Sequence, residues 1–309
     1  MGFGHAHGHA GEDVARASYR GRLVLACVIT LSIVAAQALG AWVTGSLALL
    51  TDALHSLIDS IGLLVAVIAA GLMFKAATTQ RTWGYRRVEI LAGLVQAALL
   101  LVIGIYAVIE GVDRLSTPHQ VLHVELLVFG AIGLIGNLLS LWVLSSGRRA
   151  NFNLRAAFLE VLADALGSIG VMVAAAVIWV TGWHQADAVA ALVIATVIIP
   201  RALLLLRETG RILLEFAPRG LDLEEVRAHL LNVEHVKEVH DLHASTVATG
   251  LPVLSAHVVV DEACFSNGCA PEKLAELRAC VAEHFDVPVE HSTFQLETAS
   301  QARTEQQGH

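Results

Sequence analysis

The chain has 309 residues, of which 55% are hydrophobic and only 16% are charged, and its formal net charge at pH 7 is −8. Soluble domains usually carry about a quarter charged residues, so this composition indicates a membrane protein with a smaller polar part. The negative net charge argues against a nucleic-acid-binding protein, which needs a basic face.

The first 20 residues are rich in glycine and histidine and are predicted to be a flexible N-terminus. His5, His7 and His9 could collect metal loosely, but no framework in the sequence holds them in place. No cleavable signal peptide is expected, because the N-terminus is polar and the first apolar segment is long enough to remain as a spanning helix.

Six apolar segments follow, each near or above the length of about 20 residues that a helix needs to cross a bilayer. They cover residues 23–43, 46–74, 88–109, 121–144, 158–180 and 186–206. The fold class predicted for residues 21–208 is therefore a membrane all-α domain, a bundle of six transmembrane helices.

Basic residues distinguish the two sides of this bundle. They concentrate at residues 16–22, 75–87 and 148–155 and again just after the sixth segment, whereas the opposite connections hold little more than Arg114. Connections rich in Lys and Arg stay in the cytoplasm. Both termini are therefore predicted to be cytoplasmic, in a multi-pass protein of the cell membrane (the inner or plasma membrane).

The pattern after residue 208 is that of a soluble domain. Asp222 is expected to cap a helix that runs to Leu231, with Glu225 completing a capping box. Strands are predicted at residues 236–243, 253–260 and 290–296, and a helix that Pro271 opens runs to about residue 285. This order predicts a small α+β domain at residues 209–297, followed by a disordered tail at 298–309.

The four cysteines do not form the pattern of an extracellular disulfide framework, since one lies in an apolar segment and three lie in the polar tail. The tail is therefore expected in a reducing compartment. Cys264 and Cys269 could supply thiolates to a metal or could only shape a loop.

Two pairs of ionisable residues lie inside apolar segments. His55 and Asp59 are four residues apart in TDALHSLIDS, and Glu160 and Asp164 repeat the spacing in AFLEVLADALGS. Residues four apart project from one face of a helix. Ionisable groups at bilayer depth are costly and usually functional. These four side chains therefore predict one intramembrane site for a divalent cation, and no organic cofactor is expected.

Structural roles remain open for the same residues. His55 could be a satisfied structural histidine, and the acidic pair of the fifth segment could hydrogen-bond to Gln37 or Asn137. Asp52 lies on nearly the same helix face as His55 and could support the site or admit the metal.

The formal charges of this set favour coupling to protons. With His55 neutral and the three carboxylates ionised the set carries −3, and a divalent cation leaves −1, which is costly in a low dielectric. We therefore expect one carboxyl to stay protonated or a nearby cation to compensate. Metal binding must expel protons from its ligands, which predicts metal–proton exchange.

The chain resembles the cation diffusion facilitator family of divalent-metal/proton antiporters over nearly its whole length. The likeness rests on the motifs ALGAWVTGSLALLTDALHSLID, RTWGYRRVEILAG, LEVLADALGSIGV, VHDLH, SAHVVV and EHSTFQLE. The resemblance implies a homodimer with six membrane helices and a ferredoxin-like cytoplasmic domain, which exports metal, most commonly zinc, and is not an enzyme.

One departure from that family concerns the metal. Zinc-selective relatives carry H-x-x-x-D in the fifth segment, and here Glu160 stands where His is expected. A carboxylate in place of an imidazole hardens the ligand set. Zinc remains the first expectation, and cobalt, cadmium, manganese and ferrous iron remain open.

The resemblance also implies sites outside the membrane. His240, His257 and His291 match positions that bind a regulatory metal in relatives, although each could be an ordinary surface or interface histidine. A second group, Arg86, Arg87 and Glu89, is expected to make salt bridges that control opening, or else to form a solvated charge cluster.

Two other functional classes are alternatives to transport. A membrane metal sensor would use the tail histidines to report cytoplasmic metal. An intramembrane metalloenzyme could use the same His and carboxylate ligands, but the sequence contains no H-E-x-x-H pair, and the tail domain fits transport better.

Overall fold

The structure is a computed structural model that describes residues 9–73, 77–145 and 152–305. It divides into two compact units, residues 1–67 with 92–206 and residues 68–91 with 207–309. His5, His7 and the last four residues of the predicted tail lie outside the described residues. Helix α1 (His9–Thr44) begins within the segment that was predicted to be flexible.

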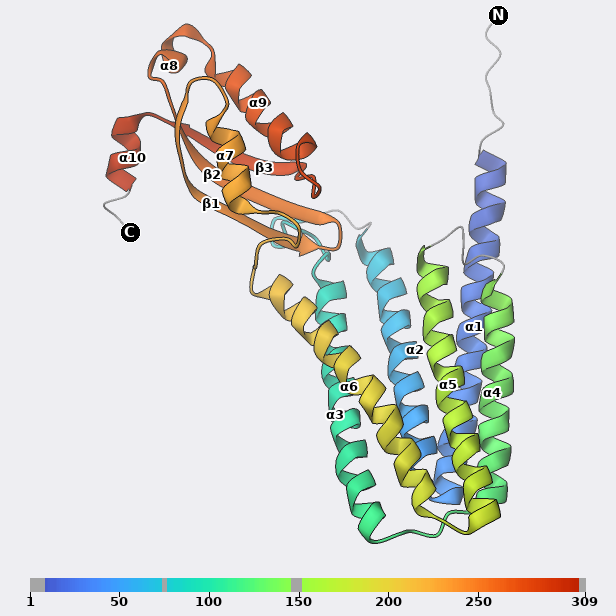
Figure 1. The fold of residues 1–309 in the computed structure, drawn as a ribbon. Coiled ribbons are helices and arrows are strands. Elements are labelled where there is room, and N and C mark those ends of the chain that lie inside the picture. The colour runs from blue at the N-terminus through green and yellow to red at the C-terminus, as the bar shows by residue number, and fades with distance from the viewer. Residues whose placement is uncertain (1–8, 74–76, 146–151, 306–309) are drawn as a thin grey trace, which may run out of the picture. The chain divides into compact units, whose positions relative to one another are not determined.

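Long helices build the first unit (Figure 1). After α1 come α2 (Leu47–Met73), α3 (Val88–Ser116), α4 (His123–Ser145), α5 (Phe152–Thr181) and α6 (Gln185–Leu213). Among the described residues, five helical stretches are long and apolar enough to cross a membrane: Leu25–Thr44, Val88–Ser116, His123–Ser145, Phe158–Thr181 and Gln185–Leu213. The chain therefore has a multi-pass helical membrane domain. That α2 also crosses the bilayer stays a prediction.

The outward faces of these helices are apolar. Large side chains such as Ile109, Trp142, Leu166 and Val197 are all more than 60% exposed. A continuous apolar surface of this kind is unfavourable in water but suits the hydrocarbon of a bilayer. Many polar side chains of the unit, among them Gln37, Asp52 and Asn137, are instead buried.

Glycines on α4 bring this helix close to its neighbours α1 and α5. A Cβ atom added at Gly133 would lie 2.8 Å from the side-chain nitrogen of Gln37 on α1 and 3.0 Å from the hydroxyl of Ser168 on α5. Small residues allow membrane helices to approach in this way. The close approach lets polar groups from several helices meet in the interior.

The start of α2 is held by a buried carboxylate from α6. Asp187, 1% exposed, accepts hydrogen bonds from the hydroxyl of Ser46 and, at 2.7 Å, from the backbone N–H of Leu47. The Ser46 hydroxyl in turn accepts the Leu49 N–H at 3.0 Å. Since the first N–H groups of a helix have no partner within it, these bonds fix the end of α2 and its position against α6.

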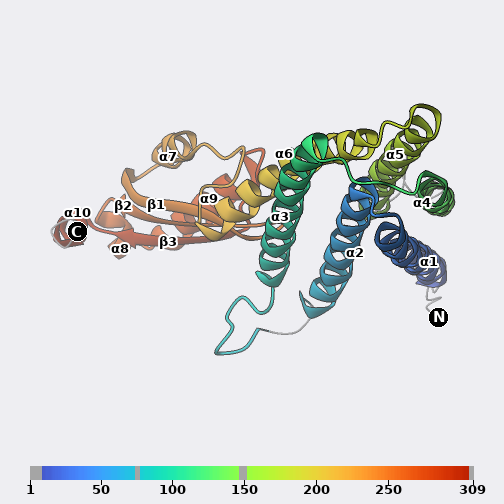
Figure 2. The ribbon, with the colours of Figure 1, turned by 90° about the horizontal axis from the view of Figure 1, so that it is seen from below.

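The second unit contains a small three-stranded sheet with helices (Figure 2). Its elements are α7 (Leu223–Leu231), β1 (Val236–Ala248), β2 (Leu251–Val260), α8 (Ala263–Asn267), α9 (Ala270–Glu283), β3 (His291–Glu297) and α10 (Ala299–Glu305). The strand order is β1-β2-β3, with β1 antiparallel and β3 parallel to β2. One apolar core joins the sheet to α7 and α9.

The predicted order of helix, two strands, helix and strand is present in α7, β1, β2, α9 and β3. The Asp222 carboxylate caps α7 as expected, accepting the Glu224 N–H at 2.9 Å. Strand β1 extends to Ala248, beyond the predicted end, because it continues to pair with β2 up to the Thr249–Gly250 turn.

Helix α10 replaces part of the tail that was predicted to be disordered. Thr298 and Gln301 form a reciprocal capping box, in which the Thr298 N–H donates to the Gln301 side chain at 2.9 Å and the Gln301 N–H donates to the Thr298 hydroxyl at 3.4 Å. Ala302 is buried at 3% exposure. The cap and the buried alanine together order a short segment that its composition alone does not mark as helical.

Of the two roles expected for Cys264 and Cys269, that of thiolate ligands is wrong, because the structure joins the two residues in a disulfide. The single turn of α8 separates them, and Gly268, with a φ of 85°, reverses the chain directly before Cys269. This brings the two Cα atoms to 4.8 Å, within the range that a disulfide spans. The distribution of the four cysteines over the whole sequence does not indicate a disulfide between two residues that are five positions apart.

Replacing Asp187 with alanine tests the link between α6 and α2. The change leaves a buried hydroxyl and a buried N–H without their acceptor, so we expect the folded protein to lose about 1–3 kcal/mol. Thermal unfolding of the purified protein in detergent measures the loss. Asp113→Ala, at an exposed position of α3, is the matched control, and an equal shift in both variants would contradict the capping role.

Candidate metal sites

Three of the four residues predicted to form an intramembrane site lie together. The His55 Nε2 atom is 3.7 Å from Asp59 Oδ2 on the same helix and 3.9 Å from Asp164 Oδ1 on α5. All three side chains are at most 9% exposed. The spacing of four residues on α2 and the approach of α5 produce this convergence.

The donor atoms of this cluster fit a cation. Asp164 Oδ1, which lies 3.9 Å from His55 Nε2, is buried and makes no hydrogen bond within the described part of the chain. Buried polar atoms normally have partners, so unsatisfied ones call for an explanation such as an ion. One imidazole and two carboxylates form a nitrogen and oxygen set of the kind that binds zinc.

A small cavity of about 30 Å³ adjoins the cluster and is lined by Asp59, Glu160 and Asp164, together with Cys27 of α1. Its volume is close to that of one water molecule. The space is large enough for a single ion or water molecule.

The fourth predicted ligand, Glu160, forms an ion pair with Arg201, for which no role was predicted from the sequence. Arg201 of α6 places Nη2 3.0 Å from Glu160 Oε1 and Nη1 3.3 Å from Asp59 Oδ2. Glu160 is also more exposed than the other three, with 31% of its side chain accessible. The structure thus connects Glu160 to the cluster through a guanidinium group.

Arg201 is a nearby cation, one of the two ways in which the negative charge of the carboxylates was expected to be compensated. It lowers the negative charge of the set from −3 to −2, which a divalent cation neutralises. The sequence signal for this residue was a basic side chain inside an apolar segment, since such residues usually pair with an acidic partner in the bundle.

Asp52 lies outside this cluster, in a separate polar network at the centre of the bundle. It is 1% exposed and accepts hydrogen bonds from Gln37 Nε2 at 2.6 Å and from the Ser168 hydroxyl at 3.3 Å. Asn137 Nδ2 donates to the same hydroxyl at 3.4 Å. Gln37 and Asn137, which could have satisfied the acidic pair of α5, are therefore bound to Asp52 and Ser168.

A second cluster lies on the sheet. His240 and His257 are direct partners of β1 and β2, with ring centroids 5.3 Å apart. Glu297 at the end of β3 is 1% exposed, and its Oε1 is 2.7 Å from His240 Nε2 and 3.5 Å from His257 Nδ1. These three residues could together hold a metal ion.

The structure does not bring His291 to this cluster. His291 pairs with Val253, four residues or about 13 Å along β2 from His257, and its ring contacts Trp83 with centroids 4.9 Å apart. The strand register places Glu297 there instead, because His257 pairs with Gln295. The strand predicted from the sequence ended at Leu296, and the signal for this ligand was the acidic residue directly after it.

Two of the three charged residues at the start of α3, Arg87 and Glu89, have partners within the second unit. Arg87 Nη2 is 2.9 Å from Glu215 Oε1, and the Glu89 carboxylate accepts the backbone N–H of Thr249 at 2.8 Å. Arg86 is exposed and makes no ion pair within residues 77–145 or elsewhere in the described chain. Exposed pairs of this kind contribute little to stability, so they are contacts that can form and break easily.

Comparison with known families identifies the chain. Residues 23–214 match the cation efflux transmembrane domain, and residues 218–299 match the cytoplasmic domain of cation efflux proteins. The chain belongs to the cation diffusion facilitator family. The members of this family of cation efflux proteins are transporters and not enzymes.

Full-length relatives of this cation diffusion facilitator are similar throughout. The metal cation efflux system protein CzcD of Cupriavidus metallidurans is 38% identical over 299 residues, which cover 97% of this chain and 91% of that protein. The cadmium, cobalt and zinc/H⁺–K⁺ antiporter of Bacillus subtilis is 35% identical over 278 residues, 89% of this chain and 88% of that protein. The zinc transporter ZitB of Escherichia coli is 33% identical over 295 residues, 95% of this chain and 92% of that protein.

Replacing Glu297 or His291 distinguishes the cluster seen on the sheet from the one expected from the sequence. Glu297→Gln removes a carboxylate from the cluster, so we expect zinc affinity at this site to fall by at least about tenfold. His291→Gln is expected to leave it unchanged. Equilibrium dialysis of zinc against the purified full chain measures both. The opposite order of effects would favour His291 as the ligand.

Proposed function

We propose that this protein exports divalent metal cations, zinc foremost, from the cytoplasm across the cell membrane in exchange for protons. The observation that carries the proposal is the buried cluster of His55, Asp59 and Asp164, whose donor atoms lie between α2 and α5. The names of the relatives, which include a zinc transporter and a cadmium, cobalt and zinc antiporter, support the same class of cargo.

The proposed cargo site consists of His55, Asp59 and Asp164, with water completing four-coordinate geometry around zinc. Glu160 acts through Arg201, which pairs with it and with Asp59 at 3.0 and 3.3 Å. The guanidinium offsets one of the three carboxylate charges, and the divalent cation offsets the other two. Cobalt, cadmium, manganese and ferrous iron are alternative cargoes, because they accept the same nitrogen and oxygen donors.

Proton exchange follows from the chemistry of this ligand set. A metal binds deprotonated carboxylates and a neutral imidazole, so its arrival displaces protons and its departure readmits them. If the site opens alternately to each side of the membrane, metal leaves the cell as protons come in. Both termini lie in the cytoplasm in this scheme.

The cytoplasmic part is proposed to form the homodimer and to carry a regulatory metal at His240, His257 and Glu297. The match of residues 218–299 to the cytoplasmic domain of cation efflux proteins supports the dimer. The buried Glu297 carboxylate beside two imidazoles supports the metal site. The same cluster favours a second candidate function, a membrane metal sensor, which would bind cytoplasmic metal without moving it.

Metal flux into proteoliposomes tests transport directly. Asp164→Asn removes a carboxylate from the cargo cluster, and we expect zinc flux driven by a pH gradient to fall to the level of protein-free vesicles. Asp113→Asn, an exposed carboxylate that lies outside the cluster, is the matched control and is expected to keep the flux of the unchanged protein.

A pH-sensitive dye inside the same vesicles tests the exchange. Proton movement should accompany zinc and disappear in Asp164→Asn. Zinc flux without proton movement would refute the antiport scheme, and no flux at all would favour the sensor.

A double-mutant cycle tests whether Glu160 acts through Arg201. Glu160→Gln and Arg201→Gln are each expected to lower zinc flux, because each removes one partner of the same ion pair. The double variant should then lose little more than either single variant, since residues in contact are not additive. Additive losses would indicate that Glu160 binds the cargo independently of Arg201.

A further inference from the structure

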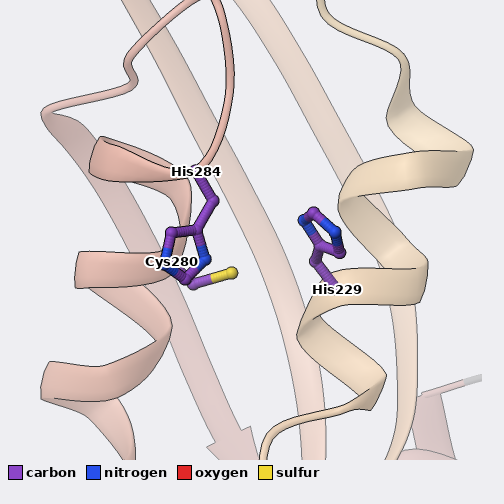
Figure 3. Close-up of side chains that lie close together, drawn as sticks. All are labelled: His229, Cys280 and His284. Carbon is purple, nitrogen blue, oxygen red and sulfur yellow. The ribbon is translucent and has the colours of Figure 1, made fainter.

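A third group of potential metal ligands lies between helices α7 and α9 of the second unit. His229 is near the end of α7, and Cys280 and His284 lie four residues apart at the end of α9, on one helix face (Figure 3). None of the three belongs to the cargo cluster or to the cluster of His240, His257 and Glu297.

The side chains converge on one small volume. One possible ligand atom from each lies within 4.8 Å of the others. The rings of His229 and His284 have centroids 6.1 Å apart in an edge-to-face arrangement. Figure 3 shows the Cys280 sulfur directed into the gap toward His229. Two imidazoles and one thiol therefore face a common point.

Two features indicate that this convergence is not ordinary core packing. The buried His229 Nδ1 makes no hydrogen bond to any residue that the structure describes. Cys280 is a free thiol, 5% exposed, in a domain whose Cys264 and Cys269 form a disulfide. A purely structural role would leave the His229 nitrogen unsatisfied at a cost, whereas a cation would satisfy it.

A pocket of about 420 Å³ gives access to this point and is lined by the three side chains together with Asn232 and Glu276. The Glu276 carboxylate is held by Lys273, whose Nζ lies 2.9 and 3.0 Å from its two oxygens. Because the Glu276 carboxylate is already paired with Lys273, we expect a water molecule from the pocket to be the fourth ligand of a bound metal ion.

We propose that His229, Cys280 and His284 bind a thiophilic divalent cation, such as zinc or cadmium, and thereby fasten α7 to α9. A tetrahedral zinc with one sulfur at about 2.3 Å and two nitrogens at about 2.0 Å needs a small closure of the present spacing. His284 is exposed at the end of α9 and can supply it by rotating.

The chemistry of this site differs from that of the other two clusters. A thiolate favours softer cations than nitrogen and oxygen donors alone, so the site should prefer cadmium over manganese more strongly than the cargo cluster does. Burial raises the pKa of the Cys280 thiol. A cation that binds the Cys280 sulfur as a thiolate displaces the thiol proton.

Cobalt(II) absorption of the full chain tests the proposal. In detergent, with Cys27, Cys264 and Cys269 replaced by alanine, Cys280 is the only thiol left. Cobalt is expected to produce a near-ultraviolet band from sulfur-to-metal charge transfer, which nitrogen and oxygen sites cannot produce. The band should vanish when Cys280→Ser is added to this background.

His229→Gln and His284→Gln, made in the same background, should each weaken cobalt affinity at this band by at least about tenfold. His243→Gln, an exposed histidine outside the cluster, is the matched control and should leave it unchanged. His284 is exposed, so its variant should fold even if the change at buried Cys280 disturbs the domain.

Either of two results would overturn the proposal. One is the absence of a charge-transfer band at saturating cobalt in a folded protein whose only thiol is Cys280. The other is a band whose affinity is unaffected by both histidine changes. Neither measurement involves transport, so a failure of metal export leaves this test intact and the reverse also holds.

Discussion

The structure of the membrane domain depends on carboxylates that are buried between helices and must be balanced there. Asp59 and Asp164 lie beside His55, and Arg201 reaches Asp59 and Glu160 from another helix. Charges removed from water are costly unless they are paired or neutralised. This requirement explains why polar residues of several helices converge.

A second polar network, around Asp52, is distinct from the candidate metal site. Asp52 is satisfied by Gln37 and Ser168, whereas His55 and Asp164 keep buried donor atoms without hydrogen bonds in the described chain. The carboxylate with partners holds α1, α2 and α5 together. His55, one turn further along α2, instead faces Asp59 and Asp164 of the candidate metal site. Neighbouring residues of one helix therefore belong to different polar groups.

The cytoplasmic domain also contains groups of metal-ligating side chains, with different donor atoms. Strand register brings His240, His257 and Glu297 together on the sheet. Helix packing brings His229 to Cys280 and His284. The first set offers nitrogen and oxygen donors and the second adds sulfur, so the two sets differ in the cations that they favour. Within the described residues, the second unit thus contains two separate groups of side chains that could hold a metal ion.

The sequence by itself determined the long apolar helices, the order of elements in the tail domain and the spacing of His55 and Asp59, because periodicity and local capping depend on neighbours along the chain. Only the tertiary structure decided which distant groups meet. Arg201 pairs with Glu160 because its long side chain reaches from α6 to α5, and Glu297 lies where His291 was expected because of the register of β3 against β2. Ligand sets are properties of three-dimensional packing, and residue spacing constrains them only within a single helix or strand.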